Sequence, residues 1–257
     1  MAEIERVKFG IQGLDKALNG GFPKGNLVLL SGGAGTGKTT FCLQFLVNGA
    51  MLFGEKGLYI TTEQSVSELR KAAGNFGWRL EDLEKAGLIR VRYLNILKGD
   101  SFLKTIKAET EDFNPKRIII DSLTTLTDSM LVTDLKEDVA FSVVQVAESV
   151  NPIPRTDRLV AKTILYHLID ALRSINSATV LLTSELLEGE SGLSADQVSE
   201  FICDGVVVLH YLGVGNAQFR SFQIRKMRYT SHEMDNLIYE INTSGINIKE
   251  QNLGFKL

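Results

Sequence analysis

Runs of apolar residues recur at intervals along the first 185 positions of the chain. They occupy 26–32, 57–63, 88–94, 117–122 and 178–185. The runs are nearly continuous in Val, Ile and Leu rather than alternating with polar residues, which is typical of strands buried on both faces. A segment of helical periodicity at 38–54 separates the first two runs, and another at 65–78 follows the second. Strands that alternate with helices predict an α/β fold with a mostly parallel central sheet flanked by helices.

The pattern changes after residue 200, where strand-like runs follow one another with only short turns between them. These runs are 203–214, 217–227 and 236–241. We expect them to extend the same sheet as C-terminal antiparallel strands. No linker rich in Ser or Gly divides the chain. Residues 1–257 are therefore predicted to form a single domain.

Composition and charge narrow the classes of protein that this sequence can represent. The net charge of −3 and the pI near 5.7 give no general basic field, so nucleic acid is not the expected partner. The apolar runs are shorter than the ~20 residues of a membrane-spanning helix, so no membrane insertion is expected. The N-terminal sequence has no secretory leader, and Cys42 and Cys203 are far apart. We expect a cytoplasmic protein.

A phosphate-binding motif follows the first strand-like run. The sequence GGAGTGKTT at 32–40 fits G-x-x-x-x-G-K-[ST] and opens a helix, which is the context that the motif requires. Backbone N–H groups of such a loop hold phosphate oxygens, and the helix N-terminus adds positive charge. The expected binding residues are Gly32, Gly33, Ala34, Gly35, Thr36, Gly37, Lys38, Thr39 and Thr40. Lys38 would reach the β- and γ-phosphates of a bound nucleotide, and the hydroxyl of Thr39 would ligate Mg²⁺.

Two carboxylates end later strand-like runs and complete the candidate site. Asp121 ends the run 117–122 and is expected to hold Mg²⁺ together with Thr39. The alternative is an ordinary turn residue. Glu63 ends the run 57–63 and would polarise the attacking water as a general base. Its alternative is to cap the helix that follows. Ligands of open α/β sheets gather at this edge, which favours the functional interpretation of both residues.

Three cations crowd into four positions of a late strand. Arg225, Lys226 and Arg228 lie in QIRKMRYTSHEM, whose only acid is Glu233. Such spacing is repulsive unless an anion lies opposite. The alternative is a solvated basic strand that discourages edge-to-edge pairing.

The motifs together resemble the KaiC-like ATPases of the RecA superfamily. The resemblance begins with GIQGLDKALNGGFPKGNLVLLSGGAGTGKTT and continues through RIIIDSLTTL, TVLLTSE, FICDGVVVL and KMRYTSH. It implies a RecA-like P-loop NTPase fold, with Mg·ATP bound between the subunits of a homo-oligomer that is usually a hexamer. In that family a K-x-R pair reaches across the interface to the neighbour's γ-phosphate. The matching positions are Lys226 and Arg228, so the implied catalytic set is Glu63, Lys38, Lys226 and Arg228.

Departures from the family pattern refine this interpretation. The family commonly has two acids where this chain has Glu63-Gln64; because the first acid is kept, hydrolysis is expected to be retained, and a lower rate is left open. Tyr229 stands where Gly is frequent. Hydroxyl residues of the autophosphorylating clock module are replaced by Glu200 and Phe201. Clock-type autophosphorylation is therefore not expected.

The chain is longer than the family pattern near 129–157, where an inserted helical segment is predicted. Asp134 and Glu137 form a candidate capping box, and valines at helical spacing follow at 139–150. The stripe either packs on its own domain or forms a docking surface for a protein partner or a neighbouring subunit.

The leading hypothesis is an Mg-dependent ATPase that acts as a homo-oligomeric regulatory or signalling switch. One alternative is a DNA-processing RecA-like ATPase, although the segment 185–200 is acidic where a DNA-gripping loop would carry cations and aromatics. The other alternative is an ATP-binding scaffold of a larger machine that hardly hydrolyses its nucleotide.

Overall fold

The computed structural model describes residues 4–95, 101–133, 156–175, 178–186, 192–214 and 217–249. The predicted helix with the valine stripe, at 134–150, lies outside the described residues.

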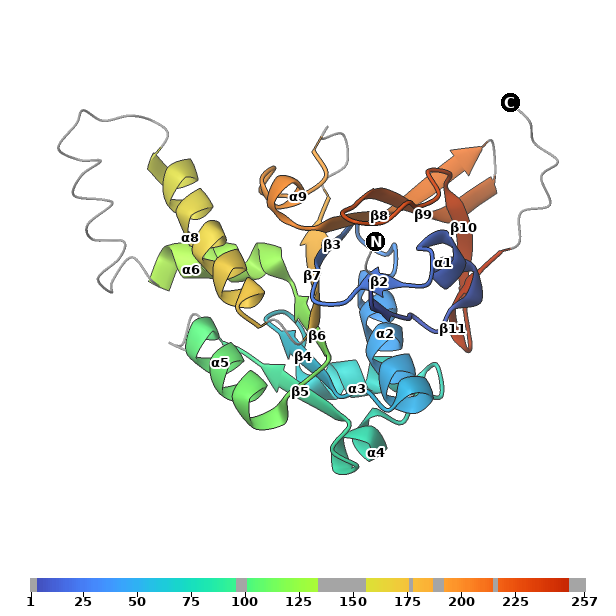
Figure 1. The fold of residues 1–257 in the computed structure, drawn as a ribbon, viewed down its shortest axis with the longest axis horizontal. Helices are drawn as coiled ribbons and strands as arrows, with labels where there is room; N and C mark the ends of the chain where they lie inside the picture. The colour runs from blue at the N-terminus through green and yellow to red at the C-terminus, as the bar shows by residue number, and fades with distance from the viewer. Residues whose placement is uncertain are drawn as a thin grey trace.

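A large mixed sheet forms the centre of the part of the chain that the structure describes (Figure 1). Its strand order is β11-β10-β9-β8-β3-β7-β6-β4-β5. The strands are β3 (Leu27–Gly32), β4 (Gly57–Thr61), β5 (Ile89–Tyr93), β6 (Arg117–Asp121), β7 (Thr179–Glu185), β8 (Gly205–Val214), β9 (Ala217–Met227), β10 (Leu237–Asn242) and β11 (Gly245–Ile248). From β8 to β5 all neighbours are parallel, whereas β9, β10 and β11 are antiparallel. The predicted parallel sheet with an antiparallel C-terminal extension is confirmed.

Helices cover both faces of the sheet. One face packs against α1 (Gln12–Ala17), α2 (Lys38–Phe53), α3 (Val66–Gly74) and α4 (Leu80–Lys85). The other packs against α5 (Phe102–Phe113), α6 (Leu123–Thr133) and α8 (Thr156–Arg173). In Figure 1, α5, α6 and α8 lie to the left of the sheet and α2 to its right. A short helix, α9 (Ser199–Ile202), precedes β8.

Each central strand supplies two hydrophobic cores. Val28 and Leu30 of β3 belong to the core under α2, while Leu27 and Leu29 belong to the core under α5, α6 and α8. Successive side chains of a strand point to opposite faces, so a strand with a core on each side needs apolar residues at every position. This explains the continuous apolar runs in the sequence.

Some elements have no clear periodicity in the sequence. The strands β1 (Arg6–Val7) and β2 (Phe22–Pro23) form a separate two-stranded sheet beside α1. Phe9 anchors this N-terminal region, with its ring centroid 4.8 Å from that of Phe45 on α2. None of the described helices is long and apolar enough to cross a lipid bilayer.

Candidate active site

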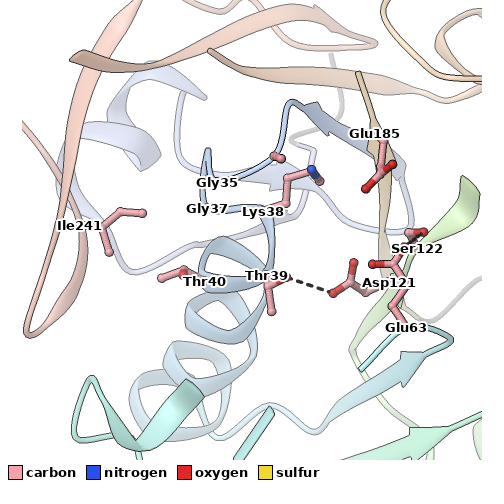
Figure 2. Close-up of a pocket in the computed structure, with 11 residues that line it drawn as sticks. Gly35, Gly37, Lys38, Thr39, Thr40, Glu63, Asp121, Ser122, Glu185 and Ile241 are labelled. Atoms are coloured by element: carbon pink, nitrogen blue, oxygen red, sulfur yellow. Dashed lines mark hydrogen bonds between the residues drawn. The ribbon is translucent and has the colours of Figure 1, made fainter. Parts of the chain in front are cut away.

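A cavity of about 360 Å³ opens where β3, β4, β6 and β7 end (Figure 2). Its walls are Ala34, Gly35, Gly37, Lys38, Thr39, Thr40, Glu63, Asp121, Ser122, Glu185 and Ile241. Figure 2 shows Ile241 on one side of the glycine-rich turn and the carboxylates on the other. The glycine-rich turn, Glu63 and Asp121 therefore meet at the carboxyl edge of the parallel sheet.

The glycine-rich turn joins β3 to α2. Gly35 and Gly37 have φ of 73° and 100°, a left-handed region that favours glycine. The amino group of Lys38 donates to the carbonyls of Gly32 and Gly33, at 2.8 and 3.2 Å. Thr36 is buried beneath the turn, and its hydroxyl donates to the Gly33 carbonyl at 2.8 Å. Gly32, Gly33 and Thr36 thus support the turn, while the other six predicted binding residues line the cavity.

Asp121 is a buried carboxylate surrounded by hydroxyl groups. Tyr59 and Thr183 donate to it at 2.5 and 2.6 Å, and the hydroxyl of Thr39 lies 3.3 Å from Oδ2. Burial raises the pKa of Asp121, although the bonds from Thr183 and Tyr59 oppose this. No ion pair to Asp121 occurs in the part of the chain that the structure describes. Carboxylate and hydroxyl oxygens are hard ligands that suit Mg²⁺, so Asp121 and Thr39 fit this metal.

Glu63 lies in the loop after β4, two residues beyond the end of the strand. Its Oε1 accepts hydrogen bonds from the hydroxyls of Ser122 and Thr125, the latter at 2.8 Å. The following helix α3 is capped instead by Ser65, which forms a capping box with Glu68. The alternative in which Glu63 caps this helix is therefore wrong. Glu63 lines the same cavity as Lys38 and Asp121.

Lys226 and Arg228 do not line the cavity of their own chain. The amino group of Lys226 donates to the carbonyls of Glu200, Phe201 and Cys203, at 3.1, 3.0 and 2.6 Å. These carbonyls lie in α9 and just after it. Burial lowers the pKa of Lys226, as does the nearby charge of Arg228.

The anion opposite Arg228 within the chain is Asp204. The guanidinium of Arg228 lies 2.9 Å from Oδ1 of Asp204, which also pairs with Arg173 at 3.1 Å. The other oxygen of Asp204 accepts the N–H of Leu27 at 3.1 Å. Two-fifths of the Arg228 side chain stays exposed, so its pairing with Asp204 leaves part of the guanidinium accessible.

The sequence matches a known family along most of its length. The family model described as "ATPase: KaiC" matches residues 7–140 and 131–253. The chain belongs to the KaiC ATPase family.

Two relatives that match this chain over most of their own length are named UPF0273 proteins. The UPF0273 protein PF1931 of Pyrococcus furiosus is 31% identical over 260 residues, which cover 95% of this chain and 93% of that protein. A UPF0273 protein of Thermotoga maritima is 34% identical over 245 residues, with 95% of both chains covered.

The clock protein itself is longer than this KaiC-family chain. The circadian clock oscillator protein KaiC of Synechococcus elongatus is 29% identical over 255 residues, which cover 95% of this chain but 44% of that protein. Among solved structures, the KaiC-like protein PH0186 of Pyrococcus horikoshii matches with a TM-score of 0.76 and 34% identity, over 96% of this chain and 100% of that one. The RecA-like fold expected for the KaiC family is therefore shown.

Several residues of this KaiC-family site are not evident from motifs. Glu185 ends β7, beside β3, and lines the cavity. The rule that selects Asp121 and Glu63 as carboxylates at strand ends also selects Glu185. Tyr59 and Thr183 lie within strands, and only the fold shows that they reach Asp121. Ile241 comes from β10, about 200 positions after the glycine-rich turn, and no sequence signal links the two.

Proposed function

We propose that this KaiC-family protein binds ATP with Mg²⁺ and hydrolyses it to ADP and phosphate. The observation that carries the proposal is the meeting of Lys38, Thr39, Asp121 and Glu63 around one cavity. These residues come from the start of α2, the loop after β4 and the end of β6, and each has the chemistry that one part of the reaction needs. Lys38 carries the charge that binds the outer phosphates.

Thr39 and Asp121 would hold Mg²⁺, which neutralises phosphate charge when bound. The contact between the two side chains brings a hydroxyl and a carboxylate to one point. Burial of Asp121 among hydroxyls leaves its charge without an ion-pair partner among the described residues, which favours a cation there.

Glu63 would accept the proton of the attacking water. Both hydroxyl donors, from Ser122 and Thr125, meet Oε1 of Glu63. They fix the orientation of the carboxylate and leave Oε2 for water. This arrangement supports a positioned general base in preference to a solvated surface acid.

We further propose that the protein works as a homo-oligomer with ATP at its interfaces, and that it acts as a regulatory switch. The sequence resemblance implies hexameric rings, in which Lys226 and Arg228 act on the nucleotide of the neighbouring subunit. Their position away from the cavity of their own chain agrees with this role. Within one subunit Lys226 donates to backbone carbonyls and Arg228 pairs with Asp204. In the assembly, contacts with the neighbour's phosphate would replace these contacts. We take residues 1–257 to form one ATPase domain, and we propose that a protein partner docks near 129–157.

The test is phosphate release from ATP, measured together with ATP binding. Purified protein should bind ATP with Mg²⁺ and release phosphate, and excess EDTA should stop the release. Binding without measurable release would favour the weakly hydrolysing scaffold. Failure to bind ATP in the presence of Mg²⁺ would refute the proposal.

A further inference from the structure

Three residues form a row across the antiparallel extension of the sheet. Tyr211 on β8 is directly opposite Arg220 on β9, and Arg220 is directly opposite Tyr239 on β10. Directly opposite residues project from the same face of a sheet. The guanidinium of Arg220 donates to the hydroxyl of Tyr211 at 2.9 Å and lies 5.1 Å from the centre of its ring. We call these residues the Tyr–Arg–Tyr row.

Both phenols of the row contact the phosphate-binding turn. The hydroxyl of Tyr211 donates to the carbonyl of Gly35, and that of Tyr239 donates to the carbonyl of Thr36, each at 2.6 Å. Ile241, two residues further along β10, packs so closely on Gly37 that an added Cβ there would lie 2.6 Å from its terminal methyl. The C-terminal strands therefore touch three consecutive residues of the turn.

The geometry of the peptide bond gives these contacts a consequence for phosphate binding. The Gly35 carbonyl shares a planar trans peptide with the N–H of Thr36, and the Thr36 carbonyl shares one with the N–H of Gly37. In such a peptide the carbonyl and the N–H point in opposite directions. Because the two phenols draw the carbonyls of Gly35 and Thr36 toward the Tyr–Arg–Tyr row, the N–H groups of Thr36 and Gly37 point away from the row. The N–H of Thr36 makes a long 3.4 Å bond to the Gly33 carbonyl, which a phosphate oxygen can replace.

The two phenols differ in their surroundings. Tyr239 is buried, with 3% of its surface exposed, and burial raises the pKa of its hydroxyl, which remains a donor throughout the physiological range. Tyr211 is about half exposed, at 47%, and Arg220 holds it in position from the neighbouring strand. The buried Tyr239 and the Arg220-bound Tyr211 thus donate to the carbonyls of two successive residues.

We propose that Tyr211 and Tyr239 are positioning residues that orient the N–H groups of Thr36 and Gly37 for the phosphates of ATP, with Arg220 bracing Tyr211. The inference rests on the proposed function, because it assigns these phenols to the same nucleotide site. It gives the antiparallel extension a role in nucleotide binding.

The test uses Tyr211→Phe, Tyr239→Phe and the double variant, which keep the rings and remove only the hydroxyls. Tyr166→Phe, on the exposed face of α8, is the matched control. In the double variant KM for ATP should rise about tenfold, the scale of two lost hydrogen bonds, while kcat changes less than about twofold. The control should keep both wild-type values. A wild-type KM in the double variant would overturn the proposal.

A second measurement needs no nucleotide. Amide hydrogen exchange over residues 33–40 should be faster in the double variant than in the wild type, and unchanged in Tyr166→Phe. If the wild type failed to bind ATP, the proposed function would fall, while this comparison would still decide whether the phenols hold the turn. Unchanged exchange over 33–40 would show that they do not hold it.

Discussion

Thr39 and Asp121 are in direct contact, although 82 positions separate them: the threonine hydroxyl lies 3.3 Å from Oδ2 of the aspartate. Thr39 belongs to the first turn of α2, and Asp121 ends β6. The contact joins the two halves of the proposed metal site. Asp121 is buried, and burial makes the ionised form of its carboxyl group unfavourable. This leads to the first prediction.

Asp121→Asn should change the pH dependence of stability in the absence of metal and nucleotide. Burial raises the folded-state pKa of Asp121. The contribution of this carboxyl group to the free energy of unfolding of the wild type is therefore complete below the unfolded pKa of about 3.9, and it is lost as pH rises through the folded-state pKa. Asparagine does not titrate. As pH rises through this range, the free energy of unfolding of Asp121→Asn minus that of the wild type should therefore increase. Urea unfolding at several pH values measures it, and a difference independent of pH would contradict the prediction.

Lys38→Ala should lower the affinity for ATP by about 100-fold, the scale of losing hydrogen bonds to a charged group. Among the described residues Lys38 donates to two carbonyls of its own turn, those of Gly32 and Gly33, so the variant should still fold. Titration with a fluorescent ATP analogue measures the affinity. Lys85→Ala, on the exposed end of α4, is the control and should bind as the wild type does. Wild-type affinity in Lys38→Ala would refute the assignment of the phosphate site.

Glu63→Gln should bind ATP normally and turn it over roughly 10²-fold more slowly, because a positioned base contributes on this scale. Glutamine keeps an oxygen that can accept from Ser122 and Thr125, so the loop should remain in place. Steady-state phosphate release measures turnover. The exposed Glu81→Gln controls for loss of an acid elsewhere. If turnover stayed normal, another group would have to orient the water.

Arg228→Ala should bind ATP but lose about 10³-fold in turnover if its guanidinium stabilises charge on a neighbour's nucleotide. Mixing it with Glu63→Gln should restore activity, because some interfaces then pair an intact Glu63 with an intact Arg228. Turnover of the wild type should also rise more than linearly with protein concentration.

The control for this mixing experiment is Arg228→Ala mixed with the double variant that carries both substitutions. No subunit in that mixture has Arg228, so no activity should return. If subunits exchange and the first mixture stays inactive, Lys226 and Arg228 do not act between subunits. Full activity of a strictly monomeric protein would lead to the same conclusion.

Most of the sheet could be predicted because its strands have apolar residues on both faces. The strands that the sequence failed to predict are β1, β2 and β11, which span only two to four residues. Such lengths carry no usable periodicity, and packing such as that of Phe9 on Phe45 determines their positions. The predicted strand at 57–63 extends too far, since β4 ends at Thr61 and Glu63 lies in the loop after it.

The candidate site was predictable where a motif or a strand end marks it. Lys38, Thr39 and Asp121 follow from local sequence and topology, and the structure brings them together. Tyr59 and Tyr211 could not be predicted, because each acts through one hydroxyl on a residue distant in sequence. No local pattern distinguishes such a tyrosine from one that only packs.

The bond between Tyr239 and Thr36 spans 203 positions, and that between Tyr211 and Gly35 spans 176. The ribosome makes the glycine-rich turn long before it makes the strands that touch it. Contacts of such long sequence separation form late, because closing the intervening chain is costly in entropy. A chain arrested before β10 would hold the whole phosphate-binding motif and still lack the Tyr239 contact. The turn therefore reaches its final set of contacts only after β10 has been made.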